Sequence, residues 1–293
     1  MKSRVKFFQE NIVFSNLFVA FCVLSLYRVS EVLLLIPHSQ DMCFFILFCS
    51  LASYNFTRIP LFFLKKNNYS GPRKWVLNNR LIFFIIIFLS SVASIYYGLT
   101  LGILYLSLPL FFIILFYTFS PIRILKIIFP NLNINILKYS IRDIPFLKIF
   151  VISFSWTYLT IIIPIIINEL NFDIYTVSNI IIRFLFVLAI TIPFDIRDLK
   201  FDKVITIPSF FGIKKSKIIA YISLFFCEII IFTLWIYNYL FFSLFLSLLI
   251  TFEVSSLFIF FVKKDNKELF FSFYIEGLSI LMFVLVYIAN YSI

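Results

Sequence analysis

Nine apolar stretches constrain this sequence more than any other feature. They are Asn11–Tyr27, Met42–Leu64, Leu81–Tyr97, Leu101–Phe119, Phe146–Ile167, Val177–Phe194, Ile218–Asn238, Tyr239–Val262 and Leu269–Tyr291. Backbone polar groups must be satisfied internally within a bilayer, so a continuous apolar run of about 20 residues forms a transmembrane helix. A barrel strand would instead alternate apolar and polar residues. The sequence predicts an all-α integral membrane protein, a bundle of nine transmembrane helices in a single polytopic domain of residues 1–293.

The composition excludes the main soluble classes of protein. Hydrophobic residues make up 62% of the chain and charged residues 13%, whereas a soluble domain is about half apolar and about a quarter charged. A soluble fold of this size could not cover so much apolar surface with so few charges. A secreted globular protein, a disordered chain and a coiled coil are therefore excluded.

The cysteines and the histidine form no recognisable metal motif. The cysteines are Cys22, Cys43, Cys49 and Cys227. They lack metal-ligand spacing, so we expect them to behave as small buried hydrophobic residues. The single histidine, His38, cannot build a histidine-rich site.

Basic residues gather on one side of the predicted bundle. With nine spans, 23 of the 25 lysines and arginines lie at the N-terminus or in the even-numbered loops. The positive-inside rule then predicts a cytoplasmic N-terminus and an outside C-terminus in a bacterial-type inner membrane. The net charge of +11 is thus a topology signal and an attraction to anionic lipid. Nucleic-acid binding would need a soluble basic domain, which the sequence lacks.

The most informative motif follows the sixth apolar stretch. Asp195, Asp198 and Asp202 form a DxxDxxxD pattern. On a helix these carboxylates share one face near the membrane surface, where like charges repel unless a cation offsets them. Mg²⁺ prefers carboxylate oxygens and completes its shell with substrate phosphates. The alternative is a solvated loop balanced by Arg197, Lys200 and Lys203, and the spacing alone favours neither.

This segment resembles the second aspartate-rich motif of the UbiA superfamily of intramembrane prenyltransferases. The Thr206-Ile207-Pro208 tripeptide and Gly212 match the tail of that motif, and Tyr117, Arg123 and Lys126 are similar to the family's tyrosine–basic element after helix four. The resemblance implies nine transmembrane helices with cytoplasmic aspartate motifs. It also implies transfer of a prenyl group from a polyprenyl diphosphate to an aromatic or related acceptor, with Mg²⁺ gripping the diphosphate.

The resemblance also implies roles for individual residues. Asp195, Asp198 and Asp202 would be the catalytic aspartates that hold Mg²⁺. Arg123 and Lys126, with Tyr117 in the same element, would bind substrate, and Lys148 opens the fifth apolar stretch on the same side. For each basic residue the alternative is a topology signal without a ligand.

The first aspartate motif of the family is degenerate in this sequence. Aligned by position, Tyr54-Asn55 replaces Asn-Asp, Arg58 replaces the second aspartate and Phe62 the third. Asn55 can offer an amide oxygen to a cation, whereas Arg58 brings a fixed positive charge. Arg58 could clamp a diphosphate in place of one Mg²⁺, pair with Asp195 or Asp198 in an inactive site, or act as a topology residue. The first two alternatives place the Arg58 side chain close to the aspartates of the second motif, and we expect this placement.

Four charged residues lie within the apolar stretches. Arg183, Glu228, Glu253 and Glu276 would be about 12–16 Å deep at 1.5 Å per residue. Charges at this depth usually face the bundle interior, and we predict an Arg183-centred ion network with Glu228 or Glu276. This network would stabilise contacts between helices. Alternatively, it would form a polar wall for an acceptor, or a proton relay. Arg28 and Glu31, one turn apart, predict an interfacial pair.

The sequence therefore predicts a membrane prenyltransferase-like protein. The alternative is a catalytically inactive relative that binds or moves an isoprenoid lipid or serves as a membrane scaffold, and the missing carboxylates of the first motif favour it.

Overall fold

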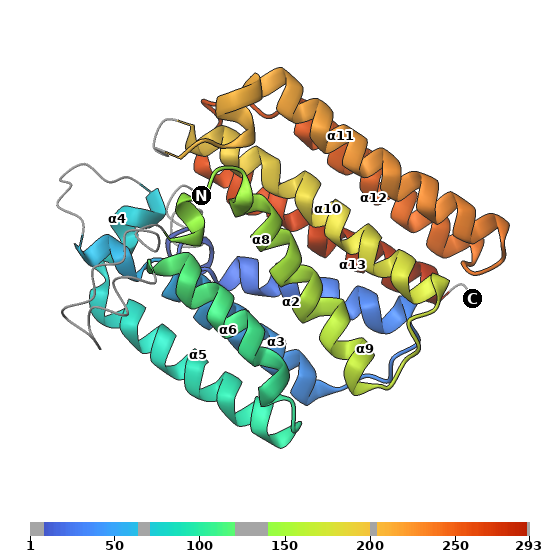
Figure 1. The fold of residues 1–293 in the computed structure, drawn as a ribbon, viewed down its shortest axis with the longest axis horizontal. Coiled ribbons are helices and arrows are strands. Elements are labelled where there is room, and N and C mark those ends of the chain that lie inside the picture. The colour runs from blue at the N-terminus through green and yellow to red at the C-terminus, as the bar shows by residue number, and fades with distance from the viewer. Residues whose placement is uncertain (1–8, 64–70, 121–139, 200–203, 292–293) are drawn as a thin grey trace.

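The chain folds into a bundle of long helices (Figure 1). The computed structural model describes residues 9–63, 71–120, 140–199 and 204–291, so the predicted site residues Arg123, Lys126 and Asp202 lie outside the described part. In chain order the elements are η1 (Gln9–Val13), α2 (Leu17–Leu33), α3 (Gln40–Phe56), η2 (Ile59–Phe63), α4 (Gly71–Asn78), α5 (Arg80–Thr100), α6 (Leu104–Thr118), η3 (Ile141–Asp143), α8 (Leu147–Thr157), η4 (Tyr158–Ile162), α9 (Ile163–Ile167), α10 (Ile174–Asp198), α11 (Ile207–Ile236), α12 (Phe242–Phe260), η5 (Phe270–Ile275) and α13 (Glu276–Asn290).

Within the described residues, seven helices are long and apolar enough to cross a membrane. They are Gln40–Phe63, Arg80–Thr100, Leu147–Ile167, Ile174–Asp198, Ile207–Ile236, Phe242–Phe260 and Phe270–Asn290. The apolar helix α6 is shorter, at 15 residues, and α2 has 17 residues. These helices confirm a multi-pass, all-helical membrane protein, and each of the nine predicted stretches overlaps a helical segment. The count of nine crossings remains a prediction.

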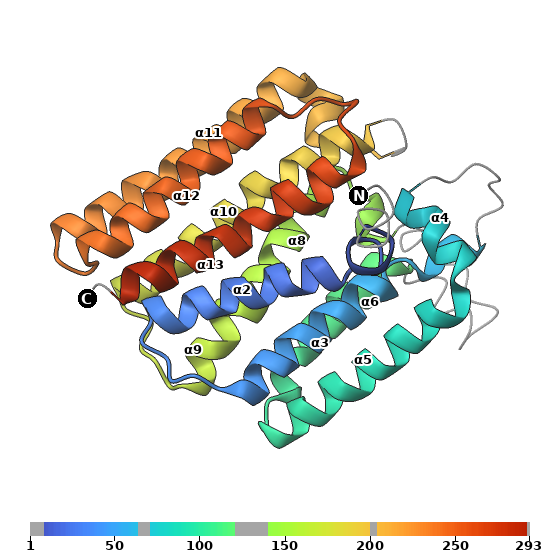
Figure 2. The same cartoon turned by 180° about the vertical axis from the view of Figure 1, so that it is seen from behind.

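The helices pack as a chain of neighbours. α2 packs between α3 and α13, α10 packs between α8 and α11, and α12 packs between α11 and α13. Figure 2, which views the bundle from the side opposite to Figure 1, shows α2 and α13 side by side. On the other flank, α5 packs against α3. α2 therefore contacts helices of both flanks of the bundle. The start of α2 contributes to the site described below.

Two helix boundaries differ from the predicted ones for local reasons. α3 ends at Phe56, before the predicted Leu64, because Pro60 has no N–H to continue an α-helix. The chain continues as the 3₁₀ turn η2. α11 begins at Ile207, before the predicted Ile218, because Thr206 and Ser209 form a capping box there.

Gly212 then interrupts α11 with a φ of 81°, which favours glycine. The short first segment of the helix therefore turns away from the long membrane-spanning part.

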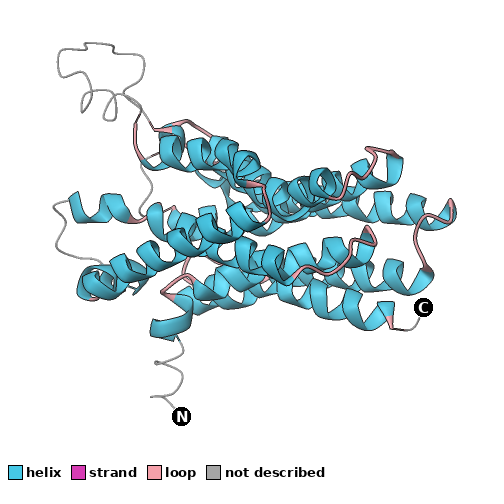
Figure 3. Cartoon of the chain, turned by 90° about the horizontal axis from the view of Figure 1, so that it is seen from below, coloured by secondary structure: helices cyan, strands magenta, loops and turns pink. Residues whose placement is uncertain are grey.

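Hydrogen bonds tie the helices together at both ends of the bundle. At one end, the Phe146 N–H donates to the Ile205 carbonyl over 3.1 Å, so α8 and α11 begin side by side. At the other, the Tyr175 hydroxyl donates to the Leu33 carbonyl over 2.6 Å, which joins the start of α10 to the end of α2. Figure 3 shows η1 and the end of α13 at opposite ends. We call the end with the first turns of α2, α8 and α11 and the last turns of α3 and α10 the motif end.

Candidate functional site

A polar cavity of about 220 Å³ opens at the motif end. It lies among α2, α3, α4, α8, α10 and the segment that begins α13. Its polar lining consists of Asn16, Tyr54, Arg58, Arg73, Lys148, Thr191, Arg197, Asp198, Glu268, Ser272 and Glu276. Four of these side chains are cationic and three are carboxylates. A cavity with this lining suits an anion better than an apolar molecule.

Lys148, in the first turn of α8, reaches the aspartates in the last turn of α10. Its Nζ lies 2.8 Å from Oδ1 of Asp195 and 3.5 Å from Oδ2 of Asp198. Only 3% of the Asp195 side chain and 12% of the Lys148 side chain are exposed. The DxxD spacing puts the two carboxylates one helical turn apart, and one ammonium group is shared between them.

Arg197 holds the other face of Asp198. Its Nε and Nη2 donate to the two carboxylate oxygens of Asp198 over 2.8 and 3.2 Å, and its Nη1 donates to Oε1 of Glu268 over 2.8 Å. The same Glu268 oxygen accepts a 3.0 Å hydrogen bond from Ser272. The guanidinium also lies over the Phe194 ring, 5.1 Å from its centroid. Arg197 is therefore fixed between a carboxylate pair and an aromatic face.

The π-helical turn η5 helps to shape this wall. It spans Phe270–Ile275 and turns Ser272 toward the cavity, directly before Glu276 at the start of α13. π-Helical turns inside α-helices are frequent at functional sites.

Arg58 lines the same cavity but binds neutral groups of the η1–α2 junction. Its guanidinium donates to the Phe14 carbonyl over 2.6 Å and to the side-chain oxygen of Asn16. Among the described residues, no ion pair joins Arg58 to Asp195 or Asp198. The described residues therefore do not show the alternative in which Arg58 pairs with Asp195 or Asp198, since Lys148 and Arg197 contact these carboxylates instead.

Asn55 does not face the cavity. It is fully buried, its side-chain oxygen accepts from Asn16 over 3.2 Å, and its amide donates to the carbonyls of Ser15 and Leu51. Asn55 thus joins α3 to the start of α2 by hydrogen bonds. This structural role explains a buried polar residue at this position without any ligand.

An apolar cavity of about 130 Å³ adjoins the polar one. Tyr54, Ile152 and Trp156 line both cavities. The rest of its wall comes from α2, α3, α6, α8 and the following turn, and it includes the predicted residue Tyr117. A third cavity of about 370 Å³ between α3, α5 and α6 shares Cys49, Ser53, Leu110 and Ile114 with the second. Polar and apolar spaces therefore follow one another from the motif end into the bundle.

Arg183 does not form the predicted ion network. It is buried, with 4% exposed, and donates to the Leu26 carbonyl and to the hydroxyls of Ser30 and Thr160. Within the described ranges it makes no ion pair with Glu228 or Glu276. Arg183 instead joins α10 to α2 and to the π-helical turn η4.

The three glutamates that we expected near Arg183 lie in two places. Glu276 lines the polar cavity. Glu228 and Glu253 belong to the α11–α12 pair, where Glu253 is exposed. The equal depth that the sequence indicated therefore did not bring Arg183 and the glutamates together.

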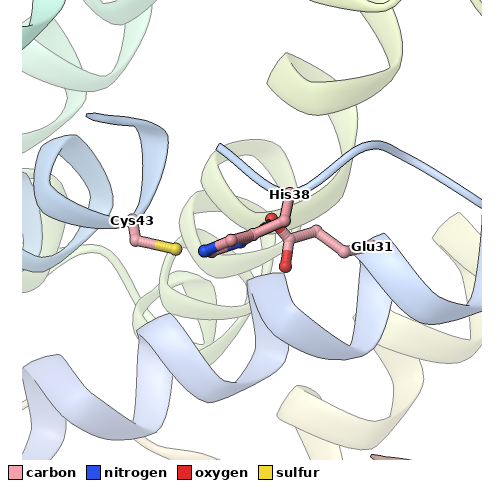
Figure 4. Close-up of side chains that lie close together, drawn as sticks. All are labelled: Glu31, His38 and Cys43. Carbon is pink, nitrogen blue, oxygen red and sulfur yellow. Dashed lines mark hydrogen bonds and ion pairs between the residues drawn. The ribbon is translucent and has the colours of Figure 1, made fainter. Parts of the chain in front are cut away.

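A second polar cluster lies at the opposite end of α2. One ligand-type atom from each of Glu31, His38 and Cys43 falls within 4.8 Å of the others. Figure 4 shows these three side chains pointing toward one another. The predicted pair of Arg28 and Glu31 forms, and the same Nη1 of Arg28 also contacts the ring of His38. The Arg28 guanidinium already contacts Glu31 and His38. We therefore interpret this cluster as a structural contact between α2 and α3.

Comparison with known proteins identifies the fold. No protein-family model and no curated protein match the sequence. A UbiA homolog from Archaeoglobus fulgidus superposes with a TM-score of 0.65 at 11% identity, covering 96% of this chain and 99% of that one. The chain has the UbiA fold.

Further solved structures agree with this result. The Archaeoglobus fulgidus homolog bound to GPP and Mg²⁺ gives a TM-score of 0.63 at 12% identity over 96% of this chain and 99% of that one. The apo UbiA homolog from Aeropyrum pernix K1 gives 0.57 at 12% identity over 94% and 98%. The fold that the aspartate motif implied is confirmed over almost the full length.

The described residues of this UbiA-fold chain do not form an open cage for a divalent cation. The motif end of α3 offers Asn55 and Arg58 in place of carboxylates. Asp195 and Asp198 carry the right donor atoms for Mg²⁺, but both lie against Lys148, and Asp198 also binds Arg197. An ion between the two aspartates would have to displace the Lys148 ammonium.

Sequence reasoning did not assign three charged residues to the polar cavity. Arg197 lies inside the DxxDxxxD motif, so its position was a usable signal, but we interpreted it as a charge that balances a loop. Arg73 in α4 and Glu268 before η5 carried no local signal, since their places depend on how distant segments pack on α10.

Proposed function

We propose that this protein binds a polyprenyl diphosphate and transfers its prenyl group to an aromatic or related acceptor. One observation carries the proposal: a cavity lined by four cationic side chains shares the Tyr54–Trp156 wall with an apolar cavity. A prenyl diphosphate has the same two parts, an anionic head and an apolar chain. The UbiA homolog from Archaeoglobus fulgidus has been solved bound to such molecules, GPP and DMAPP, with Mg²⁺.

The polar cavity suits the leaving group of such a transfer. The bond between the allylic carbon and the diphosphate oxygen breaks, and its electron pair stays with the diphosphate. Arg58, Arg73, Lys148 and Arg197 line the cavity that would receive this charge. Preorganised cations directed at developing negative charge are the strongest single contribution to catalysis of this kind. Arg123 and Lys126, outside the described residues, remain proposed additions to this set.

The apolar cavity suits the prenyl chain and the carbocation that ionisation leaves. Tyr54, Tyr117 and Trp156 are among its lining residues. Aromatic faces stabilise cations, and an apolar enclosure keeps water away from a reactive intermediate. The acceptor would then attack the allylic carbon and lose a proton.

The remaining parts of the proposal concern the cofactor and the membrane. Mg²⁺ is the ion present in the solved relatives, and if this chain bound it, Asp195 and Asp198, with Asp202 outside the described residues, would be its ligands only after the Lys148 ammonium had left them. We propose nine crossings of a bacterial-type inner membrane by one domain. Its N-terminus would be cytoplasmic and its C-terminus outside.

A second candidate function is binding of an isoprenoid diphosphate without transfer. The observation that favours it is the motif end of α3, where Asn55 is buried in a structural joint and Arg58 stands in place of a carboxylate. A protein with this change could hold or move the lipid, or serve as a scaffold, while lacking the full catalytic set.

One experiment separates the two candidates. The purified protein in lipid nanodiscs is incubated with labelled geranyl diphosphate, first alone to measure binding and then with aromatic acceptors, and the products are read by mass spectrometry. Binding with acceptor-dependent loss of diphosphate supports the transferase, and saturable binding without turnover supports the carrier. No binding to the wild type, under conditions where it is folded, contradicts both.

A further inference from the structure

The Lys148 ammonium lies where a divalent cation would bind Asp195 and Asp198. Its Nζ lies 2.8 Å from Oδ1 of Asp195 and 3.5 Å from Oδ2 of Asp198. A metal ion that bridged these carboxylates would need the same oxygens and the same space. The ammonium and a divalent cation therefore exclude one another at this position.

The surroundings stabilise the lysine in this place. Asp195 is almost fully buried, with 3% exposed, so its charge needs a close counter-ion. The α8 backbone that carries Lys148 is fixed beside α11 by the hydrogen bond from the Phe146 N–H to the Ile205 carbonyl. Arg197 occupies both oxygens of Asp198 from the other side. The aspartates thus have cationic partners from two helices without a metal.

We infer that Lys148 replaces a divalent cation between Asp195 and Asp198, so that in this protein the two aspartates position cationic side chains and the diphosphate is bound without Mg²⁺. The part that concerns the diphosphate rests on the proposed function. Asp195 and Asp198 then act as positioning residues for Lys148 and Arg197. Arg58 extends the same replacement to the other wall, since it stands where the first motif would supply a carboxylate.

Direct metal binding tests the role of Lys148 without any substrate. Mn²⁺ is titrated into the wild type, Lys148→Gln, Lys148→Gln with Asp195→Asn, and the control Lys217→Gln, and bound ion is measured by electron paramagnetic resonance. Lys217 is a suitable control because it binds the Phe260 carbonyl, away from the cavity. We expect Lys148→Gln to bind Mn²⁺ at least about tenfold more tightly than the wild type, and the double variant and Lys217→Gln to resemble the wild type. Mn²⁺ binding by the wild type as tight as that by Lys148→Gln would overturn the inference.

A measurement on the wild type alone keeps the test independent of how the variants fold. Binding of geranyl diphosphate is compared in excess EDTA and in Mg²⁺. We expect the two dissociation constants to agree within about threefold, which is less than 1 kcal/mol. A loss of more than about tenfold in EDTA would overturn the inference and leave the proposed function standing. Absence of binding in both buffers would overturn the proposed function and the diphosphate part of the inference, while the Mn²⁺ titration still decides the role of Lys148.

Discussion

The indole N–H of Trp156 donates a 2.6 Å hydrogen bond to the hydroxyl of Tyr54, and this pair forms the wall between the polar and the apolar cavity. The two rings meet edge to face with centroids 6.3 Å apart. The contact joins α3 to α8 where a bound prenyl diphosphate would change from head to chain.

Tyr54→Phe should destabilise the protein while keeping the wall intact. The substitution leaves the Trp156 N–H, which belongs to a residue only 7% exposed, without its acceptor, at a cost of about 1–3 kcal/mol. Thermal unfolding in detergent measures the effect. Tyr287→Phe is the matched control, since it removes the hydroxyl contact with Tyr291 on the exposed part of α13. Equal melting shifts for the two variants would contradict the structural role of Tyr54.

Arg183 should contribute to stability and not to ligand binding. Arg183→Met removes donors from the Leu26 carbonyl and from Ser30 and Thr160, and interhelical hydrogen bonds of this kind are worth about 1–2 kcal/mol. We expect a lower unfolding temperature and unchanged binding of geranyl diphosphate, because Arg183 lines none of the three cavities. A fully stable variant with altered binding would instead support a polar substrate wall.

Two substitutions of Arg58 should separate charge from geometry. Arg58→Lys keeps the positive charge but loses the paired hydrogen bonds to Phe14 and Asn16. We expect it to lower stability and to retain measurable diphosphate binding. Arg58→Leu should lower both, with binding weakened by about tenfold or more. If titration calorimetry gives the same affinity for both variants, the charge of Arg58 has no part in binding.

The stability that Asp173 gives to α10 should be lost only in acid. The Thr176 N–H donates to its carboxylate over 2.8 Å, which lowers the pKa of Asp173. A carboxyl with a lower pKa in the folded state stabilises the protein above its unfolded pKa of about 3.9, and the contribution disappears as the pH falls through the folded pKa. Wild type and Asp173→Ala should therefore differ in melting temperature at pH 7 and converge near pH 2. A difference that stays constant with pH would contradict this.

The sequence predicted the features that the bilayer dictates and missed those that depend on packing between distant segments. Each continuous apolar run predicted a helix that the structure contains, although boundaries such as the start of α11 were displaced by up to about three turns, and the DxxD spacing put Asp195 and Asp198 on one face at the motif end. The partners of these aspartates could not be read locally, because Lys148 reaches them from another helix and Glu268 binds Arg197 across 71 positions in the chain. The prediction for Arg183 was wrong for the same reason. The sequence places this residue within an apolar stretch, but the direction of its side chain depends on its hydrogen bonds to α2.

Photo-crosslinking tests the central claim most directly. A geranyl diphosphate analogue with a photoreactive group at the end of its chain is bound to the protein in nanodiscs, irradiated, and located by peptide mass spectrometry. If the diphosphate lies in the polar cavity and the chain passes Tyr54 and Trp156, the label falls on the α6 and α8 peptides that contain Ile113, Tyr117 and Val151, and excess unlabelled geranyl diphosphate prevents it. A label that resists competition, or that falls on α11 and α12 instead, would contradict the account.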